Sequence, residues 1–180
     1  IGKAADWDVS GVTSLGNVFY GCTNFNQDIG MWDTSNIQSM ANLFKGCTNF
    51  NQDITSWDTS SVTGMGNLFD GCINFNQNIS TWDTSNVTDM WGMFDGATSF
   101  EQPINAWNYE KVAYLNDFLD GHGFEQALYV AILAKINDNT HINNVSADFG
   151  NSDPDAAGIS DRTDLVADGW TIVDNDGTFT

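Results

Sequence analysis

Cationic side chains are scarce in this sequence. Five lysines and arginines stand against 24 aspartates and glutamates, which gives a formal net charge of -19. Proteins that bind nucleic acid draw much of their affinity from Lys and Arg contacts to phosphate. We therefore expect neither nucleic acid nor an anionic membrane surface among the partners. The acidity predicts a solvated, self-repelling surface, and binding of divalent cations such as calcium is the alternative.

Long apolar runs are also missing. No stretch approaches the roughly 18 apolar residues of a membrane span, and the first residues show no basic segment followed by an apolar run. We expect no membrane insertion and no targeting signal in this segment. Because the sequence starts directly in a repeat-like segment, we expect it to be a fragment of a longer protein.

Catalytic motifs are the third absence. The two histidines, His122 and His141, lie outside any Cys-x-x-Cys, His-Glu-x-x-His or nucleophile-elbow motif, and no glycine-rich phosphate loop is present. Neighbouring acidic residues are weak evidence for a catalytic acid–base pair here, because so many acidic residues bring such pairs together by chance. We expect no enzyme activity and assign no catalytic residues.

A repeat of 25 residues dominates what is present. Tryptophans recur at this interval, and so do phenylalanines, isoleucines and glycines. The register is unbroken from Asp6 to about Gly121. The columns with this spacing are Trp7, Trp32, Trp57, Trp82 and Trp107; Phe19, Phe44, Phe69 and Phe94; Phe25, Phe50, Phe75 and Phe100; Ile29, Ile54, Ile79 and Ile104; and Gly21, Gly46, Gly71, Gly96 and Gly121.

One repeat unit carries the signals of a short helix. Residues 33–36 are N-cap residue types, and Ile37, Met40, Leu43 and Phe44 follow at helical spacing. Gly46 then stands where a helix C-cap glycine belongs. These residues predict one short helix with a single apolar face.

A short strand is predicted after the glycine. Residues 50–54 (FNQDI) have apolar residues at both ends of a period-2 pattern. One helix and one strand cannot bury their own apolar faces, so the units must stack, with the strands pairing in parallel. We therefore expect an α/β solenoid of about four and a half rungs over residues 1–121. Its columns of Trp, Phe, Met and Leu would form the core, with equivalent side chains about 4.8 Å apart.

The repeat decays after about Phe118, and residues 122–180 are interpreted as a C-terminal cap of mixed α/β structure. Within it, residues 124–137 predict a longer helix with one apolar face. Residues 145–149 and 170–173 are expected to form strands, with a helix at 160–167 between them.

The repeats resemble those of a known family. The segments FNQDIGMWDTSNIQSMANLFKGCTNFNQDI and WDTSNVTDMWGMFDGATSFEQPINAW are similar to the repeats of BspA-like leucine-rich-repeat surface proteins, which are also abundant in mycoplasma lipoproteins. The tail, with DFGNSDPDAAG before RTDLVADGWTIVDNDG, is similar to the way such proteins often end. The resemblance implies a leucine-rich-repeat-like right-handed solenoid, exported to the cell surface. It also implies attachment to host proteins, matrix or other cells, and it implies no catalytic residues.

Three residue columns allow more than one interpretation. Cys22, Cys47 and Cys72 favour buried, reduced packing, since an odd number allows no full disulfide framework; one disulfide or metal chemistry is the alternative. The Trp column is expected to pack, and a row of exposed platforms for sugar rings is the alternative. The third column is expected to point inward and to bond amide to amide along the stack; it comprises Gln27, Gln52, Gln77 and Gln102.

Two acidic features invite a calcium hypothesis. Asp8, Asp33, Asp58 and Asp83 precede the expected helices, and N-capping explains them without a metal. Residues 174–177 lack the spacing of an EF-hand loop, so a turn is favoured. We assign no metal ligands and no cofactor.

The outward side of the expected strands is the candidate contact surface. Horseshoe-shaped repeat proteins commonly bind partners on the strand face, and solvated polar surface is the alternative. We expect an extracellular adhesion module that contacts a protein through this face; a glycan-binding module using the Trp column and a structural spacer are the other hypotheses. The candidate ligand-binding residues are Asn26, Asp28, Asn51, Asp53, Asn76, Asn78 and Glu101.

Overall fold

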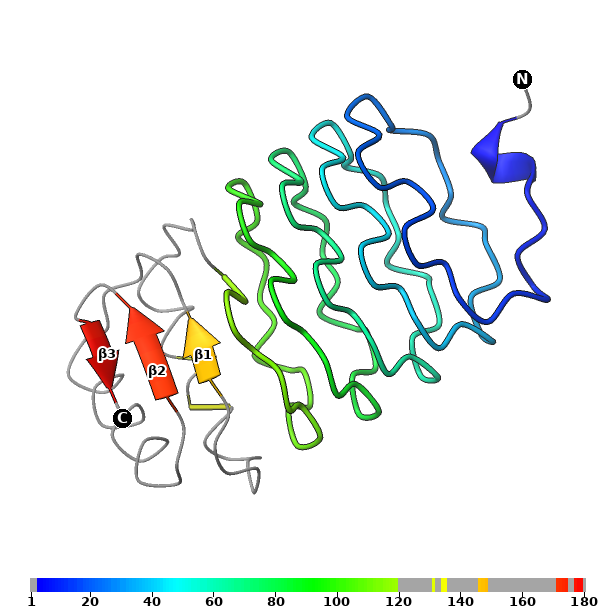
Figure 1. Ribbon diagram of the computed structural model, residues 1–180. Coiled ribbons are helices and arrows are strands. Elements are labelled where there is room, and N and C mark those ends of the chain that lie inside the picture. The colour runs from blue at the N-terminus through cyan, green and yellow to red at the C-terminus, as the bar shows by residue number, and fades with distance from the viewer. Residues whose placement is uncertain are drawn as a thin grey trace.

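The computed structural model describes residues 3–119, 131, 134, 135, 146–148, 171–174 and 177–179. In Figure 1 the repeats form successive coils that lie side by side, beginning at the N-terminal end. The named elements are a 3-10 turn, η1 (Ala4–Asp6), and the strands β1 (Ser146–Asp148), β2 (Thr171–Asp174) and β3 (Gly177–Phe179). β2 pairs in parallel with β1 and antiparallel with β3.

Backbone hydrogen bonds join each coil to the next one. In the second coil the amides of Met40, Asn42 and Phe44 donate to carbonyls of the third coil, at N···O distances of 2.9 to 3.1 Å. The amides between them close tight turns within their own coil, as the Leu43 amide does on the Met40 carbonyl at 3.1 Å. The chain therefore alternates between one bond along the stack and one local turn.

The helix expected at the start of each unit is absent, and this part of the fold prediction is wrong. Among the described residues of the repeats, only the three-residue η1 is helical. Asn42 and Gly46 have φ of 58° and 76°, and this pair of left-handed residues four positions apart interrupts the run of right-handed residues that a helix requires. Gly46 has the conformation of a C-cap glycine, but it ends a tight turn instead of a helix.

The strand expected at 50–54 is absent as well, so the repeats are not the predicted α/β solenoid of helix and strand. The described coils pair through single parallel bridges only, which link Ser14, Ser39, Gly64, Asp89 and Tyr114 in sequence. At Asn51 the backbone amide donates to the side-chain oxygen of Asn26 in the preceding coil, at 2.9 Å. A side chain thus takes the place of the carbonyl that a ladder would supply, and no strand propagates.

The predicted aromatic columns form the core, as expected. Phe69 is fully buried, with ring centroids 5.8 Å from Phe44 and 5.6 Å from Phe94 in the adjacent coils, and 3.9 Å from Phe75 in its own coil. Adjacent tryptophan rings of the column lie 6.0 to 6.5 Å apart. These spacings exceed the 4.8 Å expected for a strand ladder.

The tryptophan column is packed and hydrogen-bonded. Trp57 is only 3% exposed, and its indole N–H donates to the Ile29 carbonyl of the preceding coil at 3.1 Å. The indoles of Trp32, Trp82 and Trp107 are also buried, and each N–H donates to a backbone carbonyl of the preceding coil. Trp7, in the first coil, is exposed. The column therefore offers no row of indole faces on which sugars could stack.

The cysteine column is reduced, and its burial changes along the stack. Cys47 and Cys72 are buried, and each thiol donates to the carbonyl of a phenylalanine in the preceding coil at 3.0 Å. Burial raises the pKa of the Cys47 thiol to about 12 and that of Cys72 further still. Cys22 is exposed, so the expectation of buried packing is confirmed for two cysteines and wrong for the first.

This difference predicts selective thiol labelling. Under native conditions a disulfide reagent such as Ellman's reagent is expected to modify Cys22 alone, because the attacking species is an accessible thiolate. Unfolding in urea should expose the other two thiols to the reagent. Mass spectrometry of the labelled protein before and after unfolding checks this. Native labelling of Cys47 or Cys72 at the rate of Cys22 would contradict the burial of the column.

In the C-terminal region, β1 lies inside the strand expected at 145–149, and β2 overlaps the strand expected at 170–173. The helix expected at 124–137 lies outside the described residues apart from three helical positions, 131, 134 and 135. The helix expected at 160–167 also lies outside them.

Candidate functional site

The predicted contact residues lie at the surface of the coils, but the amides among them serve the stack itself. The Asn51 side-chain oxygen accepts the Asn76 backbone amide at 3.0 Å and the Gln77 side-chain amide at 2.8 Å. Asn26 and Asn76 make the same pair of bonds to the coils that follow them. This asparagine column is therefore a hydrogen-bonded ladder between coils.

The remaining contact candidates are exposed, and all but one close a local turn. Asp28, Asp53 and Asn78 each accept the backbone amide two residues ahead, at 2.9 to 3.0 Å. Glu101 is exposed, and its backbone amide donates to Asn76 at 3.1 Å. The structure thus places all seven candidates along neighbouring columns, where they form a polar surface.

The glutamine column behaves differently from its prediction. Gln52, Gln77 and Gln102 are partly buried, and each donates to the asparagine of the preceding coil. The expectation that these amides bond to one another is wrong. The same asparagine oxygen also accepts the backbone amide of the residue before each glutamine.

The aspartates expected to cap helices instead cap turns. Asp58 accepts the Ser60 backbone amide at 2.9 Å and the Ser60 hydroxyl at 2.6 Å. These bonds, led by the hydroxyl, lower the pKa of Asp58, and serine bonds lower the pKa of Asp8, Asp33 and Asp83 in the same way. Among the described residues, no three His, Cys, Asp or Glu side chains cluster as a metal site would require.

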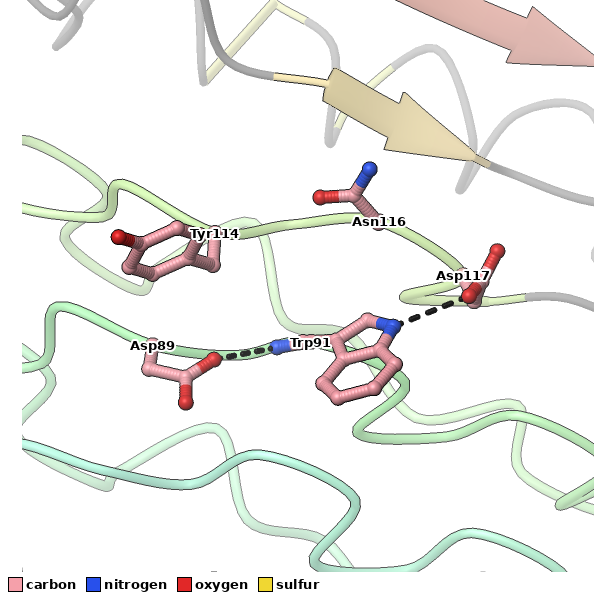
Figure 2. Close-up of a pocket in the computed structure, with 5 residues that line it drawn as sticks. All are labelled: Asp89, Trp91, Tyr114, Asn116 and Asp117. Carbon is pink, nitrogen blue, oxygen red and sulfur yellow. Dashed lines mark hydrogen bonds between the residues drawn. The ribbon is translucent and has the colours of Figure 1, made fainter.

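A hollow of about 530 Å³ opens where the fourth and fifth coils meet, and it is the candidate functional site. Figure 2 shows its lining side chains lying along two neighbouring coil segments. Asp89 pairs with Tyr114 through the last of the parallel bridges. The described residues that line the hollow are Asp89, Trp91, Tyr114, Asn116 and Asp117.

Backbone alternation brings these side chains to one face. Met90 and Leu115 are fully buried in the core, so their neighbours on either side point outward. Trp91 is 51% exposed and Tyr114 is 61% exposed. Each coil thus contributes one aromatic ring and polar groups to the same patch of surface.

Hydrogen bonds fix the orientation of the Trp91 indole. Its backbone amide donates to the Asp89 carboxylate at 2.9 Å, and its indole N–H donates to the Asp117 carboxylate at 3.0 Å (Figure 2). Asp117 has a φ of 54°, which aspartate tolerates better than most residues. The indole therefore presents a held aromatic face between two carboxylates.

The hollow arises where the repeat departs from its own pattern. The column that contains Asp89 and Tyr114 carries Ser14, Ser39 and Gly64 in the first three coils. The column that contains Trp91 and Asn116 carries Gly16, Ala41 and Gly66. Six small residues thus give way to four larger ones. This departure was the available sequence signal, and a search for what recurs every 25 residues passes over it.

Comparison with known proteins places the chain in one family. A family model described as "Mycoplasma protein of unknown function, DUF285" matches residues 2–72 and 53–154, which together span most of the chain. Neither the curated proteins nor the solved structures contain a match. Within the described residues, no helix has the length and apolar character needed to cross a membrane.

Proposed function

Since the chain belongs to the family of mycoplasma proteins of unknown function known as DUF285, we propose that it is a non-catalytic adhesion module of a larger exported surface protein. In this proposal the module contacts a protein partner. The resemblance of its repeats to BspA-like surface proteins supports the extracellular location. The stacked coils present a long surface without a catalytic motif, and repeat proteins commonly bind their partners through such extended surfaces.

The observation that carries the proposal is that Trp91 and Tyr114 are both exposed and line the same hollow. Aromatic side chains of this size are enriched at binding hot spots, and an exposed apolar cluster rimmed by polar groups is typical of an interaction site. Among the described residues, the other exposed large apolar side chains lie on the first coil, as Tyr20 does, or outside the hollow, as Met31 and Ile73 do. We therefore place the contact at the hollow and not on the asparagine face.

Cell binding tests this placement. The fluorescently labelled chain is incubated with cultured epithelial cells, and bound fluorescence is measured by flow cytometry against protein concentration. The double variant Trp91→Ala/Tyr114→Ala is expected to bind at least about ten-fold more weakly, because it removes two aromatic anchors. Its urea midpoint should remain close to that of the parent, since both rings are largely solvent-exposed.

Two controls separate the hollow from the rest of the surface. Met31→Ala removes a side chain that is 92% exposed elsewhere and should leave binding unchanged. Asp28→Ala/Asp53→Ala alters the polar face first expected to make the contact. Loss of binding in this variant, with retention in the aromatic one, would transfer the contact to that face. Absence of saturable binding to any cell surface would overturn the proposal.

A further inference from the structure

The lining of the hollow combines two carboxylates with two aromatic rings. Asp89 and Asp117 flank Trp91, and Asn116 and Tyr114 complete the described lining, which contains no cationic side chain. The whole chain carries a formal net charge of -19. The hollow is therefore an acidic concavity in an acidic protein, and its electrostatic complement is a cation.

The aromatic faces are suited to a cation of one particular shape. A guanidinium group is planar, is weakly hydrated for its charge, and stacks on tryptophan and tyrosine. It also donates two parallel hydrogen bonds to a carboxylate. Trp91 is held in place by Asp117 through its indole N–H, and Asp89 lies on the same face with one oxygen engaged by the Trp91 amide. Among the described residues, the other Asp89 oxygen makes no hydrogen bond, and it offers an acceptor beside the ring.

We propose that the hollow receives an arginine side chain from a basic segment of the protein partner, stacked on Trp91 and bonded to Asp89. This inference rests on the proposed function, and it names the chemistry of the partner. A neutral sugar would also use the aromatic faces and donate its hydroxyls to the carboxylates, but it gains nothing from the negative charge of the chain. The negative field of the chain accelerates the approach of a basic partner and weakens as salt screens it.

Calorimetric titration with defined peptides tests the proposal. The probe is an alanine-rich nonapeptide with three spaced arginines, and its matched control replaces each arginine by citrulline, which is neutral but similar in shape. The arginine peptide is expected to bind at least about ten-fold more tightly than the citrulline peptide, since the charge supplies the cation–π and carboxylate contacts. Raising the salt concentration should reduce but not abolish the difference.

A pair of single substitutions separates the site from general charge attraction. Asp89→Asn keeps the oxygen that accepts the Trp91 amide and removes one negative charge. Asp58→Asn does the same at an exposed turn of the third coil, where its oxygen accepts the Ser60 amide. The first variant is expected to lose about ten-fold in affinity and the second less than about two-fold. Equal losses in both would show diffuse attraction only and overturn the proposal.

The cell assay distinguishes this failure from failure of the proposed function. One outcome is that Trp91→Ala/Tyr114→Ala abolishes cell binding while Asp89→Asn binds cells and peptide like the parent. The proposal of an arginine ligand is then wrong, but the hollow is still supported as the adhesion site. Tight binding of a neutral glycan on an array, lost in the aromatic variant, would also replace arginine by sugar. If neither variant changes cell binding, the hollow is not the adhesion site and both proposals fail.

Discussion

Phe69→Ala is expected to lower the free energy of unfolding by about 3–5 kcal/mol, the largest effect of any single substitution considered for this chain. The Phe69 ring is fully buried and stacks on rings of the coils before and after it, and its removal leaves a cavity between three coils. Small domains are stable by only about 5–15 kcal/mol, so much of the total would be lost.

Urea titration followed by circular dichroism measures this change. Tyr20→Ala serves as the control because it also removes an aromatic ring, but one that is 57% exposed on the first coil. Its effect should stay within about 0.5 kcal/mol. Phe19→Ala is expected to fall between the two, since Phe19 has a neighbouring coil on one side only. A Phe69 variant no less stable than the Tyr20 variant would contradict a core built from stacked rings.

The second large effect is a difference in stability between alanine substitutions at two glycines of the same coil, one expected to destabilise the chain and the other to stabilise it or leave it unchanged. Gly71 has a φ of 69°, and an added Cβ would lie 3.5 Å from the Cα of Gly46 in the preceding coil. Gly71→Ala is expected to destabilise the chain by about 1–2 kcal/mol, because L side chains disfavour the left-handed region. Gly64 has ordinary φ, and its added Cβ would meet only the Ser39 hydroxyl, at 3.7 Å.

Gly64→Ala should therefore be neutral or stabilise the chain, by up to about 1 kcal/mol, because alanine reduces the freedom of the unfolded chain. Ser14 and Ser39 already occupy the same column with a Cβ. Thermal unfolding of both variants, followed by tryptophan fluorescence, provides the comparison. Equal destabilisation by the two substitutions would mean that loss of glycine itself matters and that backbone conformation at position 71 does not.

The 25-residue spacing was sufficient to predict which residues stack, because equivalent positions of identical units must occupy equivalent places in a regular array. It predicted the buried columns of Phe69 and Trp57 correctly. It did not predict the path of the backbone between them. Helical spacing at Ile37, Met40, Leu43 and Phe44 also describes a chain of tight turns that buries every third or fourth side chain.

The residue that distinguishes these two backbones is Asn42. Its column reads Asn17, Asn42, Asn67, Gly92 and Asp117, the residue types that most readily adopt positive φ, and all five do so. The preference of these residue types for positive φ, and not their polarity, is the sequence evidence against a helix. Asn51 was also misinterpreted from the sequence. Its polarity suggested a contact surface, but its side-chain oxygen accepts the backbone amide of Asn76 in the next coil.

Trp91 and Tyr114 could not be found from the periodic pattern, since they are the residues that break it. A tryptophan outside the 25-residue column looks like an incidental aromatic in the sequence alone. Only the coil stack shows that Trp91 and Tyr114 line the same hollow and that Asp89 and Asp117 both bond to Trp91. Departures from a repeat carry information about function where the repeat itself carries information about packing.

The hydrogen bonds between coils also bear on how the gene can change. Among the described residues, the side-chain bonds that join coils link positions 22 to 28 apart, such as Lys45 to Asn67 and Trp57 to Ile29. Each of these coils is therefore bonded only to its immediate neighbours. An in-frame loss or gain of one 25-residue unit would bring together two coil surfaces that already match. Recombination among the repeated segments can therefore lengthen or shorten the stack, moving the hollow nearer to or farther from the first coil without requiring a new core.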